Sequence, residues 1–403
     1  MRIFMRYTGL VLLLAMSSTL LAVNAKRPWT FFVYIAADNN LNPEADLNIA
    51  QMVKESSSSN VYIVVHLNIK RVGENKKTQK LLIQNGKITQ IGATTAEDSG
   101  SSKTLLNALQ WAITEYPSDH LLVDIWNHGS GPLNRTIQQH RGVCYDDSTG
   151  NYMTDLEYKK ALDVIVNQYR GGKKIDIICF DACLMANLEV AFTVKNYAHY
   201  LVSSQQTVPG PGYNYTDVLS IFDIKNPDAA TLARWITTSY DHYYKSSGLS
   251  YTMSCIDLSK LNAIALTTNS IAQTLTGILK TDRSGAVART ITASALPSVC
   301  PHFDEPTYID LYIFYSNLYT RTKQMGLNST QANKVKSVIR SGMTAIAQAI
   351  MLNVYSSDFV KTRGLSIYFV DLQEGIEGSY NKLYWSKINP SWLDFLYEYA
   401  YVA

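Results

Sequence analysis

HLLVDIWNHGSG, residues 120–131, is an apolar run that ends in a polar turn containing two glycines. IDIICFDACLMANLEVA, residues 175–191, has the same plan, because its first apolar run leads into the segment that carries Cys183. Continuous apolar runs of this length are typical of strands that are buried on both faces of a parallel sheet. The two stretches therefore predict two buried strands, one that delivers His128 at its carboxyl end and one that delivers Cys183.

Further strands and helices are predicted on either side of these stretches. We expect buried strands at residues 29–41 and 61–69, a hairpin near residues 79–91, and amphipathic helices at residues 101–117 and 153–169. Strands that alternate with amphipathic helices indicate an α/β fold whose mostly parallel central sheet has helices on both faces. Ligands of such sheets bind outside the carboxyl ends of the strands, where His128 and Cys183 are expected.

Composition limits the classes of function. Hydrophobic residues make up 46% of the chain, and the formal net charge is +3. This fraction supports a substantial core, and so small a charge is no footprint for nucleic acid or an anionic membrane. We expect an α/β core at residues 26–224 and a more helical region with added strands, packed on it, at residues 225–403. The five cysteines leave at least one thiol unpaired in an oxidising compartment, and their spacing gives no zinc signature.

The first 25 residues have the pattern of a secretory signal peptide. Arg2 and Arg6 flank the start of an apolar run from about Leu10 to Leu21, and small residues follow up to Ala25. These are the three parts of such a signal. The run is shorter than the ~20 apolar residues that a membrane-spanning helix needs. We therefore expect cleavage after Ala25, a secreted or periplasmic protein, and no membrane contact after the signal is removed.

His128 and Cys183 together have the chemistry of a nucleophilic dyad, since a histidine is the usual base that takes a proton from a thiol. They lie 55 residues apart in the sequence, close to the ~50 residues that separate the same pair in caspases. We expect Cys183 to open a helix at about residues 184–194, whose N-terminal dipole favours a thiolate. Taken singly, each residue has a structural alternative: a hydrogen-bonded histidine at a strand end, and a buried, inert cysteine.

The two stretches resemble known signature blocks. WNHGSG at residues 126–131 and FDACLMA at residues 180–186 look like the histidine and cysteine blocks of the clostripain family of cysteine peptidases, which belongs to the clan of caspases, legumain and gingipains. VYIAADNNL at residues 33–41 and SSQQTVPGPGYNY at residues 203–215 also look like family blocks. The resemblance implies a caspase-like α/β sandwich, with its catalytic core at residues 26–224, and endopeptidase activity after Arg or Lys.

The resemblance also implies roles for single residues. His128 matches the general base and acid, Cys183 the nucleophile, and the backbone amides of Gly129 and Cys183 the oxyanion donors. Asp181 matches the acidic residue that receives a P1 Arg or Lys, and a carboxylate there would pair bidentately with a guanidinium. The alternative for Asp181 is a strand-end residue that caps the next helix. Gln205 and Gln206 stand where the family often has acidic residues, which puts strict Arg specificity in doubt.

The resemblance also implies two further properties, self-cleavage and calcium dependence. Family members cut themselves between the histidine and cysteine blocks, and the polar loop here contains Arg135 and Arg141. We expect cleavage after Arg141, with Arg135 second, since exposed loops are nicked most easily; an ordinary basic loop is the alternative. Calcium dependence also occurs in the family, although the chemistry requires no metal. Asp146, Asp147 and Asp155 carry suitable oxygen ligands, but turn and capping roles are the alternative.

The sequence thus predicts a secreted cysteine endopeptidase that acts on proteins or peptides with basic P1 residues through a thioester acyl-enzyme. Two alternatives remain. A non-catalytic caspase-like module could bind peptides, although the presence of both His128 and Cys183 argues against it. A peptide ligase could use the same dyad to transfer the acyl group to an amine in place of water.

Overall fold

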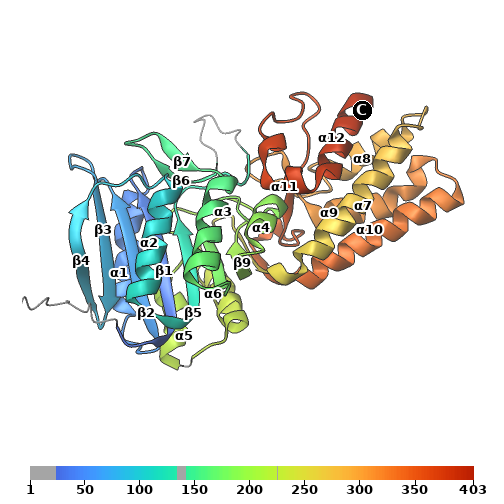
Figure 1. Cartoon of the computed structure of the whole chain (residues 1–403). Helices are drawn as coiled ribbons and strands as arrows, with labels where there is room; N and C mark the ends of the chain where they lie inside the picture. Colours follow the sequence, from blue (N-terminus) through green and yellow to red (C-terminus); the bar gives the residue numbers. More distant parts are fainter. Residues whose placement is uncertain (1–23, 134–141, 225) are drawn as a thin grey trace, which may run out of the picture.

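The computed structural model describes residues 24–133, 142–224 and 226–403. Its centre is a nine-stranded sheet (Figure 1), in the order β12 (Ile350–Tyr355), β10 (Thr252–Asp257), β9 (Ala198–Ser203), β8 (Ile175–Asp181), β5 (Ser118–Trp126), β1 (Arg27–Ala37), β2 (Val61–Ile69), β3 (Lys77–Gln84) and β4 (Lys87–Thr95). The five inner strands from β9 to β2 are parallel, and antiparallel strands extend both edges. The predicted α/β fold with a mostly parallel central sheet is confirmed, and so is the hairpin that β3 and β4 form.

Helices cover both faces of the sheet, as the alternation of strands and helices predicts. One face packs against α2 (Ser102–Glu115), α3 (Asp155–Val164) and α4 (Leu188–Val194). The other face packs against α1 (Asn42–Lys54), α5 (Tyr215–Ile224) and α6 (Ala229–Tyr244). The inner strands are buried on both faces because their side chains alternate between these two helix layers. Phe32 and Tyr34 belong to the first layer's core, and Phe31 and Val33 to the second.

The rest of the chain forms a helical body beside the sheet (Figure 1). It contains α7 (Leu261–Leu279), α8 (Ala286–Ala295), α9 (Leu311–Arg321), α10 (Ser329–Ala349), α11 (Tyr384–Ile388) and α12 (Pro390–Val402). This region also contributes β10 and β12 to the main sheet, and a small sheet of β11 (Tyr308–Asp310) and β13 (Ser366–Tyr368). The boundary near residue 224 stays a prediction, because the sheet runs continuously across it.

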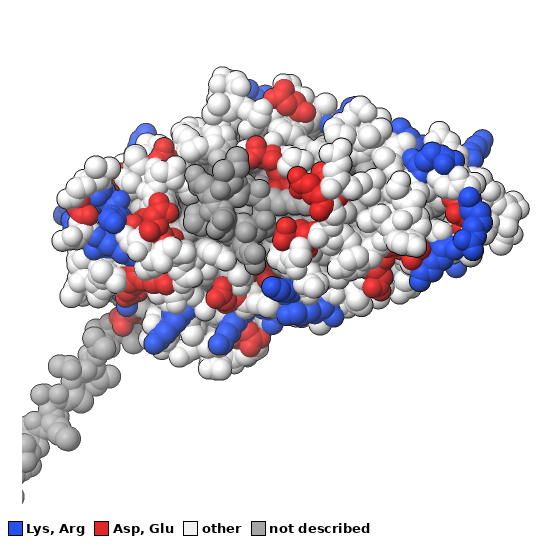
Figure 2. Space-filling view, turned by 90° about the horizontal axis from the view of Figure 1, so that it is seen from above, with Lys and Arg blue, Asp and Glu red and all other residues white. Residues whose placement is uncertain are grey.

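Two features matter for the surface above the strand ends. A small sheet of β6 (Val143–Asp146) and β7 (Asn151–Met153) lies over the carboxyl end of the main sheet. Seen from above, this face carries Asp and Glu side chains near its middle, whereas Lys and Arg gather at the end of the helical body (Figure 2). Among the described helices, none is long and apolar enough to cross a membrane.

Candidate active site

The register of β5 on β8 brings the histidine and cysteine segments together. Trp126 pairs with Asp181, and the Asn127 amide donates to the Asp181 carbonyl over 3.2 Å. His128 and Cys183 each lie two residues beyond this last pair, so both leave the sheet at the same edge. The strands that carry the two residues are therefore neighbours in the sheet.

Gly129 packs directly on the backbone of Cys183. A Cβ atom at Gly129 would lie 2.5 Å from the Cys183 carbonyl oxygen and 3.1 Å from its amide nitrogen. Real Cβ atoms do not approach backbone atoms this closely, so the position requires glycine. The backbone of the histidine segment at Gly129 thus lies directly against the backbone of the cysteine segment at Cys183.

Two side chains hold the His128 ring. The Asn40 Oδ1 atom lies 2.7 Å from His128 Nε2 and can only accept, so Nε2 carries a proton and donates. The ring also stacks on Tyr145, with 6.1 Å between ring centroids. In a neutral ring whose Nε2 is protonated, Nδ1 is the basic nitrogen.

Asn40 and Tyr145 are residues that the sequence reasoning did not single out. Asn40 follows β1, the strand that lies next to β5 in the sheet, so the parallel order of strands was the signal that could have found it. Tyr145 lies on β6, whose backbone is fixed by side chains from the ends of β1 and β5. The Asn39 and Asn127 amides donate to the Tyr145 carbonyl over 3.0 and 3.2 Å, and Asn127 Oδ1 accepts from the Tyr145 amide over 2.9 Å.

Cys183 is the cysteine with partial exposure, and its environment keeps the thiol protonated. Burial, together with the nearby charges of Asp181 and Asp304, raises the pKa of Cys183 to about 11. Backbone amides of Val208 and Gly129 act in the opposite direction, and the Val208 nitrogen lies 3.2 Å from the sulfur. A thiol with so high a pKa needs a base before it can act as a nucleophile.

The predicted helix after Cys183 starts later than expected, so the helix-dipole prediction is wrong. Leu184 adopts a left-handed conformation with φ of 65°, and α4 begins only at Leu188, capped by the Asn187 side chain. Dipole stabilisation is confined to the first turn of a helix, and Cys183 lies outside it. The remaining cysteines, Cys144, Cys179, Cys255 and Cys300, are buried, and all five thiols are unpaired.

Asp181 is the last residue of β8, two positions before Cys183, and its side chain is buried among polar groups. Its side chain is 4% exposed, and Oδ2 accepts hydrogen bonds from the Tyr213 amide over 2.9 Å and the Tyr215 hydroxyl over 3.1 Å. Burial raises the pKa of Asp181 to about 6. Within the described residues, Oδ1 has no hydrogen-bond partner. Asp181 does not cap α4, because Asn187 does.

A second buried carboxyl lies next to Asp181. The Tyr215 hydroxyl donates to Asp124 Oδ2 over 2.7 Å and so joins the two acids. Burial, and then the charge of Asp181, raises the pKa of Asp124 well above its usual range. The pair therefore favours one shared negative charge over two, which is typical of carboxyls that share a site.

Gln205 and Gln206 are both engaged by the C-terminal region. Gln205 is fully buried and bonds the Asp310 side chain over 3.1 Å, so it cannot touch a substrate. Gln206 Oε1 accepts from the Thr207 and Asp304 amides, each over 2.8 Å. The two amides thus connect the loop after β9 to the C-terminal region.

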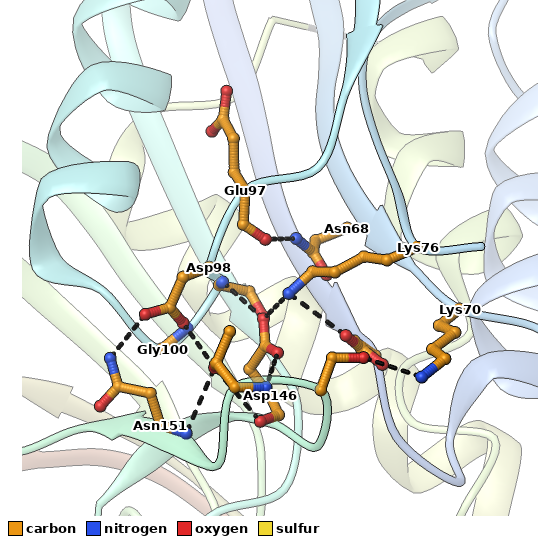
Figure 3. Close-up of polar contacts among 12 residues, drawn as sticks. Asn68, Lys70, Lys76, Glu97, Asp98, Gly100, Asp146 and Asn151 are labelled. Carbon is orange, nitrogen blue, oxygen red and sulfur yellow. Dashed lines mark hydrogen bonds and ion pairs between the residues drawn. The ribbon is translucent and has the colours of Figure 1, made fainter.

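A lysine lies among the acids where calcium was considered (Figure 3). Lys76 Nζ pairs with Asp146 Oδ2 and lies 3.2 Å from Asp38 Oδ2. Burial would raise the pKa of Asp146, but hydrogen bonds from Lys76 and the Ser99 amide outweigh it and hold the pKa below its usual value. One internal ammonium group therefore occupies the space between these two acids and balances part of their charge.

The three aspartates that were candidate calcium ligands do not gather. Asp146 is held by the lysine, Asp147 is exposed, and Asp155 accepts the Tyr384 amide over 2.8 Å at the start of α3. In the part of the chain that the structure describes, no three His, Cys, Asp or Glu side chains are arranged to hold a metal ion. Thr154 and Glu157 form the N-terminal capping box of α3.

The candidate cleavage residues Arg135 and Arg141 lie outside the described residues. The chain is described again from Gly142, which lies beside the histidine segment. The Gly142 amide donates to Ser130 Oγ over 3.0 Å, and the Ser130 amide donates to the Gly142 carbonyl over 3.1 Å. Val143 forms an antiparallel bridge with Gly129.

Comparisons with known proteins agree with this architecture. Clostripain from Hathewaya histolytica is 21% identical over 92% of this chain and 79% of its own. A secreted C11 cysteine protease from Bacteroides thetaiotaomicron, solved with an irreversible peptide inhibitor, superposes with a TM-score of 0.64 at 22% identity, over 92% of this chain and 99% of its own. An inactive zymogen of a C11 protease from Parabacteroides distasonis also gives 0.64, at 21% identity, over 91% and 99%. The model of the clostripain family matches residues 33–397, and the chain therefore belongs to the clostripain family of cysteine peptidases.

Proposed function

We propose that this cysteine peptidase is a secreted endopeptidase that cleaves after Arg or Lys, with Cys183 as nucleophile and His128 as base. The observation that carries the proposal is the packing of Gly129 on the Cys183 backbone, at the paired ends of β5 and β8. It brings base, nucleophile and two backbone amides to one edge of the sheet.

The chemistry follows from the protonation states. His128 Nδ1 accepts the proton of the Cys183 thiol, and the thiolate attacks the substrate carbonyl carbon. The oxyanion that forms accepts hydrogen bonds from the amides of Gly129 and Cys183, and His128 returns the proton to the leaving amine. Water then attacks the resulting thioester, gives its proton to His128, and releases the acid and the free thiol.

Asn40 is a positioning residue in this scheme. Its carboxamide oxygen accepts the Nε2 proton over 2.7 Å, which keeps Nδ1 as the nitrogen that exchanges protons. It also stabilises the imidazolium that forms when the thiol is deprotonated. Tyr145 limits the rotation of the ring from the other side.

Asp181 is the group that we assign to the P1 side chain. Its Oδ1 atom has no hydrogen-bond partner among the described residues, so a guanidinium or ammonium group could pair with it. The burial that raises its pKa to about 6 makes the unpaired carboxylate unfavourable. An arriving cation relieves this cost, so binding energy is available for basic side chains.

Hydrolysis of fluorogenic peptides that end in Arg, Lys, Asp or Asn tests the proposal, with the intact chain and with Cys183→Ala. We expect activity on Arg and Lys peptides that is lost in the variant. Activity that survives Cys183→Ala would refute the nucleophile, and a preference for Asp or Asn would refute the role of Asp181. If an added amine captures most of the acyl group, the enzyme is a ligase; if the wild type cuts none of the peptides, the peptide-binding module is favoured.

We also propose two processing steps. The signal peptide directs export and is cleaved after Ala25, and N-terminal sequencing of the exported protein tests this step. Self-cleavage after Arg141 would leave Gly142 as a new N-terminus beside the site. In the structure, two hydrogen bonds join Gly142 to Ser130. Intact-mass analysis of the wild type, Arg141→Ala and Arg135→Ala tests this step. A single uncut chain with full activity would show that cutting is not required.

A further inference from the structure

The loop before β11 forms a tight turn, and Asp304 lies at the start of that turn. The Phe303 amide donates to the Tyr308 carbonyl over 3.3 Å, and the Tyr308 amide donates to the Glu305 carbonyl over 2.9 Å. Buried Glu305 accepts from the amide and the hydroxyl of Thr307 over 3.1 and 2.6 Å. The turn is thus closed by its own hydrogen bonds and presents Asp304 in a fixed position.

This turn is anchored to the histidine segment. The Tyr308 hydroxyl donates to the Ser130 carbonyl over 2.8 Å and accepts from the Leu133 amide over 2.9 Å. Both partners follow His128 by a few residues. Tyr308 is fully buried, so the anchor is rigid and dry.

The turn is anchored to the cysteine segment as well. The Asp304 amide donates to Gln206 Oε1 over 2.8 Å, and the Gln206 carbonyl accepts from the Leu184 amide over 3.1 Å. Leu184 directly follows Cys183. Gln206 therefore links Asp304 to Leu184, the residue next to the nucleophile. Gln206 occupies a position where the family often has an acid.

The carboxylate of Asp304 faces solvent near the reacting sulfur. It is exposed, and the structure gives it no hydrogen bond or ion pair within the described residues. It lies close enough to Cys183 for its charge to act on the thiol. The face above the strand ends carries acidic side chains near its middle (Figure 2).

We propose that Asp304 is a specificity-determining residue, which binds a second basic side chain of the substrate, next to the P1 residue held by Asp181. The inference rests on the proposed function, because it assumes cleavage after Arg or Lys. Asp181 is buried and suits one enclosed side chain, whereas Asp304 is exposed and suits a flanking one. Peptides with two adjacent basic residues are therefore the preferred substrates.

Peptide kinetics with Asp304→Asn and Asp304→Lys test the inference, with substrates that carry Arg at P1 and Lys, Ala or Glu at P2, and a parallel set varied at P1′. We expect the wild type to favour a flanking Lys by about two- to fivefold, the range of one exposed ion pair, mainly through KM. Asp304→Asn should abolish that preference, and Asp304→Lys should reverse it toward a flanking Glu. Salt should weaken the wild-type preference and leave that of Asp304→Asn unchanged.

Asp394→Asn is the matched control, since Asp394 is an exposed acid on α12, away from the site. It should leave the flanking preference intact, and thermal unfolding should show that both variants are folded. An equal loss on all substrates, or a flanking preference that survives Asp304→Asn, would overturn the inference while Arg cleavage stands. If the wild type does not cut Arg peptides, the proposed function fails first and the inference falls with it.

Discussion

Replacing Asp181 with asparagine should make the protein more stable and less active. Burial raises the pKa of Asp181 from 3.8 to about 6, and a rise of about 2 corresponds to about 3 kcal/mol. Below pH 4 the carboxyl is neutral in both the folded and the unfolded chain, so burial carries no charge penalty. As the pH rises through 6, the buried carboxyl of the folded chain must ionise, and the free energy of unfolding falls by this amount.

The Asp181→Asn variant avoids the loss because an amide stays neutral and can still accept from Tyr213 and Tyr215. We therefore expect it to be more stable than the wild type by up to about 3 kcal/mol at pH 7, with little difference at pH 4. Urea unfolding at pH 4, 5, 6 and 7 measures the difference, with Cys183→Ala in both chains to prevent self-cleavage.

The same variant should lose activity toward basic substrates. Removing one partner of a buried charge pair costs at least ~2 kcal/mol of binding, or about 30-fold in kcat/KM for P1 Arg. A stability difference that stays constant from pH 4 to 7 would refute the assigned ionisation of Asp181. Unchanged cleavage after Arg would refute its contact with substrate, whatever the stability result.

Three further predictions concern the residues around the dyad. Asn40→Ala should lower kcat by about tenfold, the value of one hydrogen bond, and shift the acid limb of the pH–rate profile, whereas Asn42→Ala in the same turn should not. Gly129→Ala should abolish activity and lower the free energy of unfolding by about 1–3 kcal/mol, as measured by urea titration, because its Cβ has no room. Lys76→Met should destabilise the fold by about 3 kcal/mol at pH 7, because it leaves buried Asp146 without its ion-pair partner. The loss should be smaller at pH 4, because without the lysine burial raises the pKa of Asp146 and favours its neutral form; equal losses at both pH values would contradict the ion pairing.

The strands that position the dyad were predictable because continuous apolar runs mark them. β5 buries a run with Leu, Val and Ile, and β8 buries a run with Ile, Cys and Phe, so their carboxyl ends could be located from the sequence. The start of α4 could not, since the left-handed Leu184 that delays the helix is set by tertiary packing. β12 was also missed, because it is a half-buried edge strand that follows directly on α10.

The partners of the dyad were harder to predict than the dyad itself. Asn40 contacts a residue 88 positions away, and Asp304 contacts one 98 positions away. Neither belongs to a local pattern. The order of strands in the sheet brings Asn40 to His128, and the packing of the C-terminal region brings Asp304 near Cys183. Asp181 could be found because it shares a short segment with the nucleophile.

The order of strands has a consequence for any break in the chain between β5 and β6. Such a break assigns β1 to β5 to one polypeptide and β8, β9, β10 and β12 to the other, and within the main sheet the two blocks of strands pair only at β5 and β8. His128 and Cys183 stand on opposite sides of that seam. Two separately expressed fragments, one ending after β5 and one beginning before β6, would therefore each lack half of the dyad. Peptidase activity would appear only when the two fragments associate.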